Sequence, residues 1–377
     1  MENSYRIEGD TLYADSLGEP FDYWASEDWR HEIRRAVLAE GITAIPSGCF
    51  QYFDGLEEAL LPATLGEIGS SAFADCPRMG DPVLPEGVTV IGAGAFQGDY
   101  SIRRLVLPAS LVRIGENALY FGDESRLLSI EVAPGNPAFS SENGVLFTRD
   151  KTRLLKYPSA KRKAEYDVPE TVKSIADSAF AHSRYLHRIR LPEGLLTLES
   201  GAFSFCSHLE ELTVPESVTG IPSYAFFCCE RLKKLTLPKR ADYLGFESVC
   251  NCSALEAITL PEGITQLDYA AVGGNPRLRE LVIPEGVTEL CNSALIDDTG
   301  LERVVLPHSL TEIWDNAFRR CTSLEEIVIP ENVRCIDDEA FINCKKLRRV
   351  ILRTGLISDD GWLPEELRGR VEVIRER

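Results

Sequence analysis

A proline returns every 23 residues along most of this chain, and the period constrains the fold more than any other feature. Eleven of the 21 prolines keep the spacing, at Pro62, Pro85 and Pro108 and then from Pro169 to Pro330. The 61-residue step from Pro108 to Pro169 is two periods plus 15 residues. A period of about 20–50 residues indicates stacked repeats that contact only their neighbours. We therefore expect a solenoid.

Apolar residues recur at fixed places when each proline is counted as position 0. Positions 3 and 6 are mostly aliphatic, positions 10 and 11 are usually alanine and phenylalanine, as in Ala72 and Phe73, and positions 20 and 22 are aliphatic. Twelve units run from 39 to 352, with one insertion after the fourth. Residues 1–38 and 353–377 do not fit the repeat and contain Trp24, Trp29 and Trp362. We expect these two segments to cap the ends of the solenoid.

Local chemistry predicts the shape of one repeat. The residues before each proline alternate with period 2 and are β-branched, which predicts a short strand that the proline ends. Positions 3 to 6 predict a second short strand, and the Ala-Phe pair predicts a helical half-turn on the far side. The expected fold is an α/β-type repeat solenoid with a ladder of parallel strands about 4.8 Å apart on its concave face.

The segments LPEGVTVIGAGAF at 84–96 and LPHSLTEIWDNAFRRCTSLEEIVIP at 306–330 resemble the BspA-like, or treponemal-type, leucine-rich repeat family. The resemblance covers residues 39–352 and implies a leucine-rich-repeat horseshoe. The insertion at about 131–168, with turn signals at Asn143-Gly144 and Asp150-Lys151 around two short strands, also resembles that family. The family is associated with bacterial cell-surface adhesion and with binding of host or matrix proteins, and it has no catalytic residues to carry over.

Composition and charge limit the class of binding partner and the cellular location that we expect. The chain has 59 acidic and 40 basic residues, a net charge of −19, which argues against nucleic acid as a partner. No apolar run of about 18 residues is present, so we expect no membrane insertion. The first residues, MENSYRIEGD, lack the basic and apolar regions of a secretory signal. We expect a cytoplasmic protein, or a surface or secreted one if a leader has been removed.

Cysteines recur at position 14 of the repeat. They number eleven in all, an odd count that does not suggest a disulfide framework. Neighbouring Cβ atoms in register would be about 4.8 Å apart, more than the ~3.8 Å usual in a disulfide. We therefore expect six reduced, buried thiols in the core: Cys76, Cys206, Cys229, Cys252, Cys321 and Cys344.

No cofactor, metal or enzymatic activity is expected. The five histidines lack metal-ligand spacing, and no Ser/His/Asp or Cys/His set stands out. An enzyme that uses the solenoid as a scaffold would need a clustered polar set, and no repeat departs from the consensus in that way.

Positions 19 and 21 point away from the core and form the first candidate binding site. A row of mixed charge lies beside a row of valine and threonine, a combination that suits a protein interface. The candidate residues are Arg104, Arg188, Arg190, Lys234, Glu280, Arg303, Glu326 and Arg349.

The insertion is the alternative site, because its charge is inverted relative to the chain. Between 149 and 163 seven basic residues stand against one acid, Asp150, so the segment is either a solvated hairpin docked on acidic coils or a site for an acidic partner. The basic residues are Arg149, Lys151, Arg153, Lys156, Lys161, Arg162 and Lys163.

The expected function is a non-enzymatic scaffold that binds a macromolecule, with a protein as the partner. A surface adhesin for a host protein, a matrix protein or a cell-wall glycan is the alternative. A glycan-binding protein would be expected to show aromatic rings in the outward row, which has none.

Overall fold

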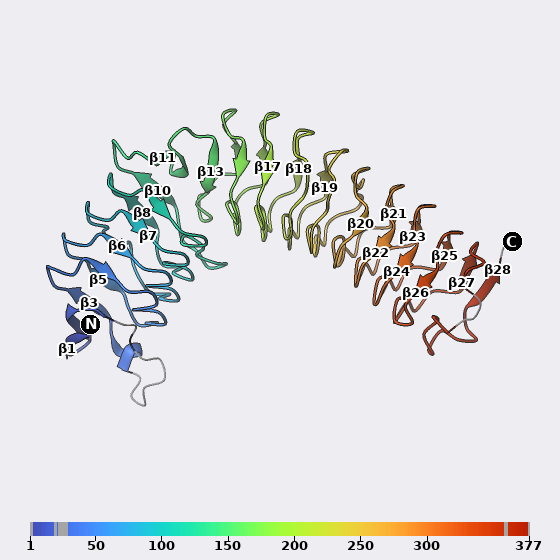
Figure 1. Ribbon diagram of the computed structural model, residues 1–377, viewed down its shortest axis with the longest axis horizontal. Helices are drawn as coiled ribbons and strands as arrows, with labels where there is room; N and C mark the ends of the chain where they lie inside the picture. Colours follow the sequence, from blue (N-terminus) through green and yellow to red (C-terminus); the bar gives the residue numbers. More distant parts are fainter. Residues whose placement is uncertain (1–2, 19–20, 22–28, 358–360, 376–377) are drawn as a thin grey trace. The chain divides into compact units, whose positions relative to one another are not determined.

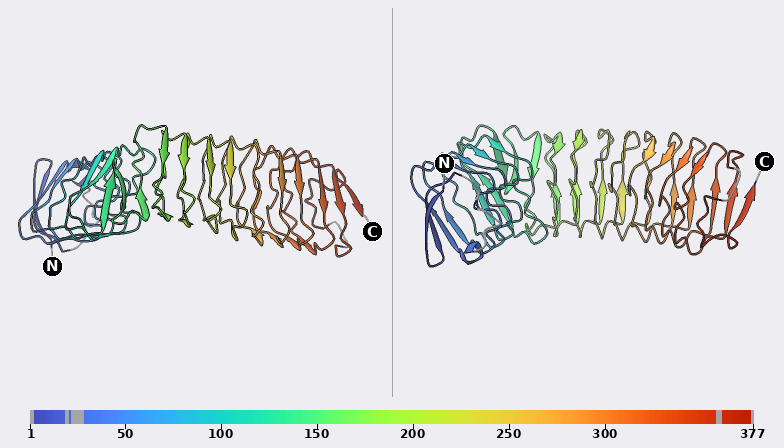
Figure 2. Two further views of the ribbon diagram at one scale, coloured as in Figure 1. Left: turned by 90° about the horizontal axis from the view of Figure 1, so that it is seen from above. Right: turned by 60° about the horizontal axis from the view of Figure 1, so that its bottom comes forward.

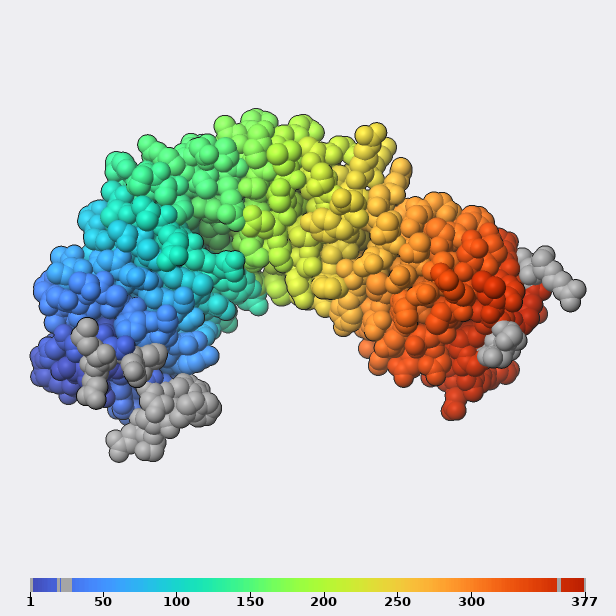
Figure 3. All heavy atoms as spheres, in the orientation of Figure 1, coloured from blue at the N-terminus to red at the C-terminus, as the bar shows by residue number. Residues whose placement is uncertain are grey.

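The computed structural model describes residues 3–18, 21, 29–357 and 361–375. The chain divides into two compact units. The N-terminal unit comprises Met1–Arg162 and Ala176–Ser183, and the C-terminal unit comprises Lys163–Ile175 and Arg184–Arg377. Within each unit the chain winds in coils that lie side by side in sequence order (Figure 1). The colour bands of the space-filling view follow the same order (Figure 3).

Most coils contribute a longer strand just before the repeat proline and a two-residue strand at positions 5 and 6. Both kinds pair in parallel with the same positions of the next coil, as Glu211 with Lys234 and Ser174 with Thr197. In the C-terminal unit the successive strands lie side by side (Figure 2). The predicted parallel ladder and the short second strands are therefore confirmed.

The N-terminal unit has the following strands, together with one 3-10 helix, η1 (Trp29–Glu32). The longer strands are β1 (Ser4–Glu8), β2 (Thr11–Ser16), β3 (Arg35–Leu38), β5 (Glu58–Leu60), β8 (Arg104–Leu107) and β10 (Ser129–Val132). The short strands are β4 (Ala44–Ile45), β6 (Glu67–Ile68), β7 (Val90–Ile91) and β9 (Arg113–Ile114). The insertion adds β11 (Phe139–Glu142), β12 (Val145–Thr148) and β13 (Arg153–Lys156).

The C-terminal unit continues both kinds of strand. The strands that precede the repeat proline, with the terminal strand β28, are β14 (Glu165–Asp167), β16 (Arg188–Arg190), β18 (Glu211–Thr213), β19 (Lys234–Thr236), β21 (Glu280–Val282), β23 (Arg303–Val305), β25 (Glu326–Ile329), β27 (Arg349–Leu352) and β28 (Glu372–Arg375). The short strands are β15 (Ser174–Ile175), β17 (Thr197–Leu198), β20 (Gln266–Leu267), β22 (Glu289–Leu290), β24 (Glu312–Ile313) and β26 (Cys335–Ile336).

The core repeats with the sequence. Phenylalanines at position 11 are fully buried and stack on one another, with ring centroids 5.3 Å apart for Phe50 and Phe73 and 5.1 Å apart for Phe318 and Phe341. The position-14 cysteines are buried as predicted. Their thiols donate to the position-11 carbonyl of the preceding coil, at 3.0 Å from Cys344 Sγ to Phe318 O.

The predicted helical half-turn is wrong, because the described residues contain no α-helix. Positions 7 to 14 form successive tight turns, in which the Ala72 amide donates to Gly69 O at 3.3 Å. The intervening amides donate to the next coil, as from Phe73 to Ala95 O at 2.9 Å. Left-handed backbone at Ser71 and Asp75 (φ 53° and 59°) prevents a helical run. A helix would use every amide within its own coil and leave none to join the coils.

The strand ladder is interrupted in the N-terminal unit by Pro82, which replaces the usual aliphatic residue at position 20. Residues 80–84 form no strand, because proline has no amide to donate. The Asp81 carboxylate accepts the amides of Arg103 and Arg104 at 2.6 and 2.9 Å. A side chain thus replaces the backbone carbonyl that serves these amides in other coils.

The insertion forms three antiparallel strands, where the sequence predicted two. β11 pairs with β12, and β12 pairs with β13. The predicted turn at Asn143-Gly144 is present, with φ values of 51° and 78° that match the two-residue hairpin turn. Lys151 in the second turn is also left-handed, at φ 56°.

The two end segments pack against the terminal coils. Phe21 and Trp29 contact the ring of Phe53, each at a centroid distance of 5.7 Å. At the other end, Trp362 lies 6.1 Å from Phe341. Trp24 lies outside the described residues. We propose that both segments are caps.

Candidate functional site on the strand face

The strand face consists of the exposed side chains at positions 19 and 21 of the coils. Arg190 occupies position 21, and the other seven residues predicted for the site occupy position 19. All eight are exposed and flank a buried position 20, as in Arg188–Arg190. Their predicted exposure is confirmed, and their role in binding stays a prediction.

Charges at position 19 alternate in sign from coil to coil and pair with one another. Arg188 contacts Glu165 at 3.2 Å and Glu211 at 2.7 Å, one carboxylate on each side. Arg349 lies likewise between Glu326 and Glu372, at 3.0 and 3.4 Å. These hydrogen bonds raise the pKa of Arg349 further above its ordinary value.

Arg303 follows the same alternation and contacts Glu280 at 3.0 Å. Arg104 contacts Glu131 at 2.5 Å, although the strand pairing places Ser129 opposite Arg104. Most charges of the predicted site therefore already have partners within the face. Sequence reasoning missed this pairing, although comparing each residue with the one 23 positions later would have shown it.

The alternation stops at Lys234, because the next coil has Ala257 at position 19. Lys234 has no ion-pair partner among the residues that the structure describes. Arg190 nearby contacts only Asp167, at 3.4 Å, with both side chains about two-thirds exposed or more. These two cations are the least neutralised of the predicted site residues on the C-terminal unit.

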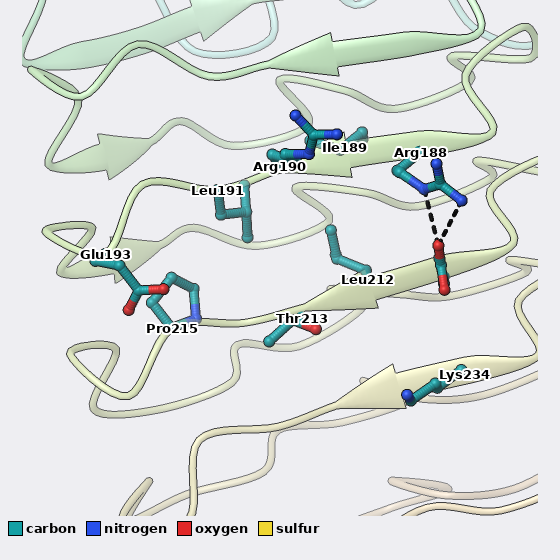
Figure 4. A pocket seen from close by; sticks show the side chains of 10 residues that line it. Arg188, Ile189, Arg190, Leu191, Glu193, Leu212, Thr213, Pro215 and Lys234 are labelled. Carbon is teal, nitrogen blue, oxygen red and sulfur yellow. Dashed lines mark hydrogen bonds and ion pairs between the residues drawn. The ribbon is translucent and has the colours of Figure 1, made fainter.

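Arg190 and Lys234 line a shallow hollow of about 350 Å³. Arg188 lies on the same rim and is hydrogen-bonded to Glu211, whereas Leu191, Thr213 and Pro215 supply its less polar wall (Figure 4). We refer to this site as the cationic hollow.

Position 21 changes chemistry along the C-terminal unit. Arg190 is followed by threonine in three coils and then by aliphatic residues, of which Val282 is 54% exposed. The strand face therefore joins a cationic hollow at one end to an aliphatic row at the other. The aliphatic row is Val282, Val305, Val328 and Ile351.

Several basic side chains of the insertion already contact other groups of the protein. Lys151 contacts Glu142 at 2.5 Å, Lys161 Nζ donates to Asn143 O at 2.6 Å, and Lys156 is buried and donates to Ser178 O at 2.9 Å. Arg149, Arg162 and Lys163 are exposed, and Arg153 is half-buried. The insertion stays the alternative site with fewer available cations than the sequence suggested.

Two groups of residues were not foreseen. His182 is buried between Tyr120, whose hydroxyl lies 2.9 Å from Nε2, and Asp123. No sequence signal marks this contact, because its partners are about 60 residues apart. The described residues hold no group of three or more His, Cys, Asp or Glu side chains suited to a metal ion. The second group is a set of exposed rings in the turns that follow the short strands of the C-terminal unit.

The BspA type leucine-rich repeat region matches this chain at residues 29–140, 162–279 and 248–359, in six copies. The chain belongs to this family. A leucine-rich repeat protein of known structure from Eubacterium ventriosum is 24% identical, with 93% of this chain and 92% of that chain covered and a TM-score of 0.67. The pneumococcal vaccine antigen PcpA is 19% identical, with 100% and 96% covered and a TM-score of 0.57.

These likenesses show the fold of the BspA-type chain, a parallel β-solenoid of leucine-rich repeats. No curated protein matches it. In the described part of the chain, no helix has the length and apolarity needed to cross a membrane.

Proposed function

We propose that this BspA-type protein is a non-enzymatic scaffold that binds another protein through the strand face of its C-terminal unit, the side expected to be concave. The observation that carries the proposal is the cationic hollow. Arg190 and Lys234 keep available charge there, in a row whose other charges are mostly paired within the face. The alternation of charge along the strand face stops at Lys234. A partner segment with a carboxylate could pair with Arg190 and Lys234 and so continue the alternation there.

The surroundings of the hollow favour a protein over a phosphate backbone. Protein interfaces combine an apolar centre with a polar rim, and the strand face offers a partly exposed aliphatic row beside charges of both signs. A nucleic acid would meet carboxylates at every second coil and a chain of net charge −19.

Charge reversal tests the proposal. The variant Arg190→Glu/Lys234→Glu should weaken binding of a captured partner about tenfold or more, because opposite charges at close contact would become like charges. The matched control is Lys239→Glu/Arg240→Glu. It makes the same change of net charge at two exposed residues, the first and second after the repeat proline Pro238.

The outcomes separate the two candidate sites. Equal loss in both double variants would mean that only net charge matters and would overturn the proposal. Binding that is unchanged in Arg190→Glu/Lys234→Glu but lost in Lys161→Glu/Arg162→Glu/Lys163→Glu would move the site to the insertion.

A further inference from the structure

The C-terminal unit carries exposed aromatic rings that the repeat does not require. Positions 8 and 9 are mostly small or polar, as at Ser70 and Ser71, and they lie in the turns that follow the short second strand. Three consecutive coils depart from this with Tyr224, Phe246 and Tyr269, each 43–49% exposed. Rings that contribute little to the core invite a role outside folding.

Neighbouring positions of the same coils add three further rings, Phe205, Phe227 and Tyr243. Phe227 lies 5.3 Å from Phe205 and 5.8 Å from Tyr224 between ring centroids. Tyr243, 48% exposed, lies over Gly220, where a Cβ would come within 1.9 Å of its Cε1 atom. The absence of a side chain at Gly220 therefore makes room for this ring. The aromatic patch is Phe205, Tyr224, Phe227, Tyr243, Phe246 and Tyr269.

Two of these rings are held against a conformational preference. Tyr224 and Phe205 occupy left-handed backbone, at φ 60° and 56°. Bulky residues rarely adopt it, and equivalent positions in other coils use Gly201 and Asn251. Folding alone would favour glycine or asparagine at both places.

The charge around the patch has one sign. Positions 3 to 13 of the four coils concerned, residues 195–205, 218–228, 241–251 and 264–274, contain no lysine, arginine or histidine. They contain four acids, Glu199, Asp242, Glu247 and Asp268. An aromatic surface whose own segments carry only carboxylates is complementary to cations.

We infer that the aromatic patch is a second interaction surface and binds a basic segment of a partner protein. Lysine or arginine side chains would lie against the ring faces by cation–π contact while the neighbouring carboxylates pair with their charge. Exposed aromatic anchors are also the residues that contribute most to protein interfaces. This surface is chemically the reverse of the cationic hollow, so each can fail without the other.

The test replaces the rings by the residue that other coils carry at the same positions. The variant Tyr224→Ser/Phe246→Ser/Tyr269→Ser keeps net charge and should stay folded, because Ser71, Ser178 and Ser293 occupy the same left-handed position in other coils. The probe is a fluorescein-labelled peptide of alternating lysine and glycine, titrated by anisotropy. Three lost cation–π contacts should weaken binding about tenfold or more.

Two controls make the result decisive. Tyr52→Asn removes an exposed tyrosine at a left-handed position outside the patch and should leave peptide affinity unchanged. Asp242→Asn/Asp268→Asn should weaken binding and flatten its salt dependence. Unchanged affinity in the triple serine variant would mean that the acidic chain attracts the peptide non-specifically and would overturn the inference. Ring-dependent binding of neutral cello-oligosaccharides without ring-dependent peptide binding would also overturn it, in favour of a glycan.

Discussion

At the scale of single residues, position 14 shows how one side chain serves two coils. Asn275 accepts the Cys252 amide at 2.9 Å and donates to Val249 O at 3.1 Å. Asp298 takes the equivalent place and accepts the Asn275 amide at 2.7 Å, but it is fully buried. Burial raises the pKa of Asp298 well above its ordinary value. The folded state therefore favours the neutral acid, which matches an asparagine in shape.

This predicts that Asp298→Asn stabilises the protein at neutral pH. The folded-state pKa is raised, so the folded state holds a proton that the unfolded state releases above about pH 4. The contribution of Asp298 to the free energy of unfolding therefore falls as the pH rises from about 4 toward the raised pKa of the folded state. Urea unfolding at pH 7 should give the Asp298→Asn variant a free energy of unfolding roughly 1 kcal/mol or more above that of the unsubstituted protein. This difference should shrink near pH 4. The exposed Asp338→Asn is the control, and a loss of stability at pH 7 would contradict the neutral acid.

The cysteine ladder makes a second residue-scale prediction. Burial raises the pKa of Cys344 to about 12, and only the thiolate reacts readily. Cys335 is exposed in the same repeat. Thiol labelling of the native protein should modify Cys335 quickly and Cys321 and Cys344 only on unfolding. Equal labelling rates at Cys335 and Cys344 would show that the position-14 thiols are accessible and would contradict their place in the core.

At the scale of the element, the sequence predicted strands well and turns poorly. Strands follow from alternation and from proline, both of which are local. The helical half-turn failed because the Ala-Phe pair was weighed alone. Gly48, Gly94 and Gly201, all with positive φ, stand immediately before positions 10 and 11 and carried a visible signal for left-handed backbone. What no local pattern shows is that alternate amides donate to the next coil.

The ends of the solenoid are tested by truncation. Removing residues 1–38 deletes strands β1 to β3 and the Phe21 and Trp29 rings that contact Phe50 and Phe53. We expect the exposed first coil to associate, giving aggregation in size-exclusion chromatography and a lower melting temperature. A soluble monomer of unchanged stability would instead identify a separate module.

At the scale of the whole molecule, the period predicted which residues are buried and which are exposed, but not where a partner binds. Exposure at Arg303 follows from its position in the repeat, whereas its pairing with Glu280 depends on the neighbouring coil. The cationic hollow and the aromatic patch both arise where coils depart from their neighbours, at Ala257 and at Tyr224. Candidate sites in a repeat protein are therefore better sought in departures from the repeat than in the repeat itself.

Stacking predicts that whole coils can be removed. Deleting residues 239–261, one 23-residue period, would join Pro238 to residue 262 and keep every later residue in register. Along the two ladders the removed coil meets its predecessor in the isolated bridges Ile221–Leu244 and Lys234–Ala257, and its turns accept further amides of that coil, as from Phe226 to Ser248 O at 2.8 Å. The deletion would also place Lys234 beside Glu280, restoring the alternation of charge.

Because each coil contacts only its neighbours, we expect cooperative thermal unfolding of the deletion variant, with a midpoint within a few degrees of that of the intact protein. Deleting only residues 239–250 is the control, since it shifts every later core position and should abolish the transition. If both deletions were equally harmful, the coils would not act as interchangeable units.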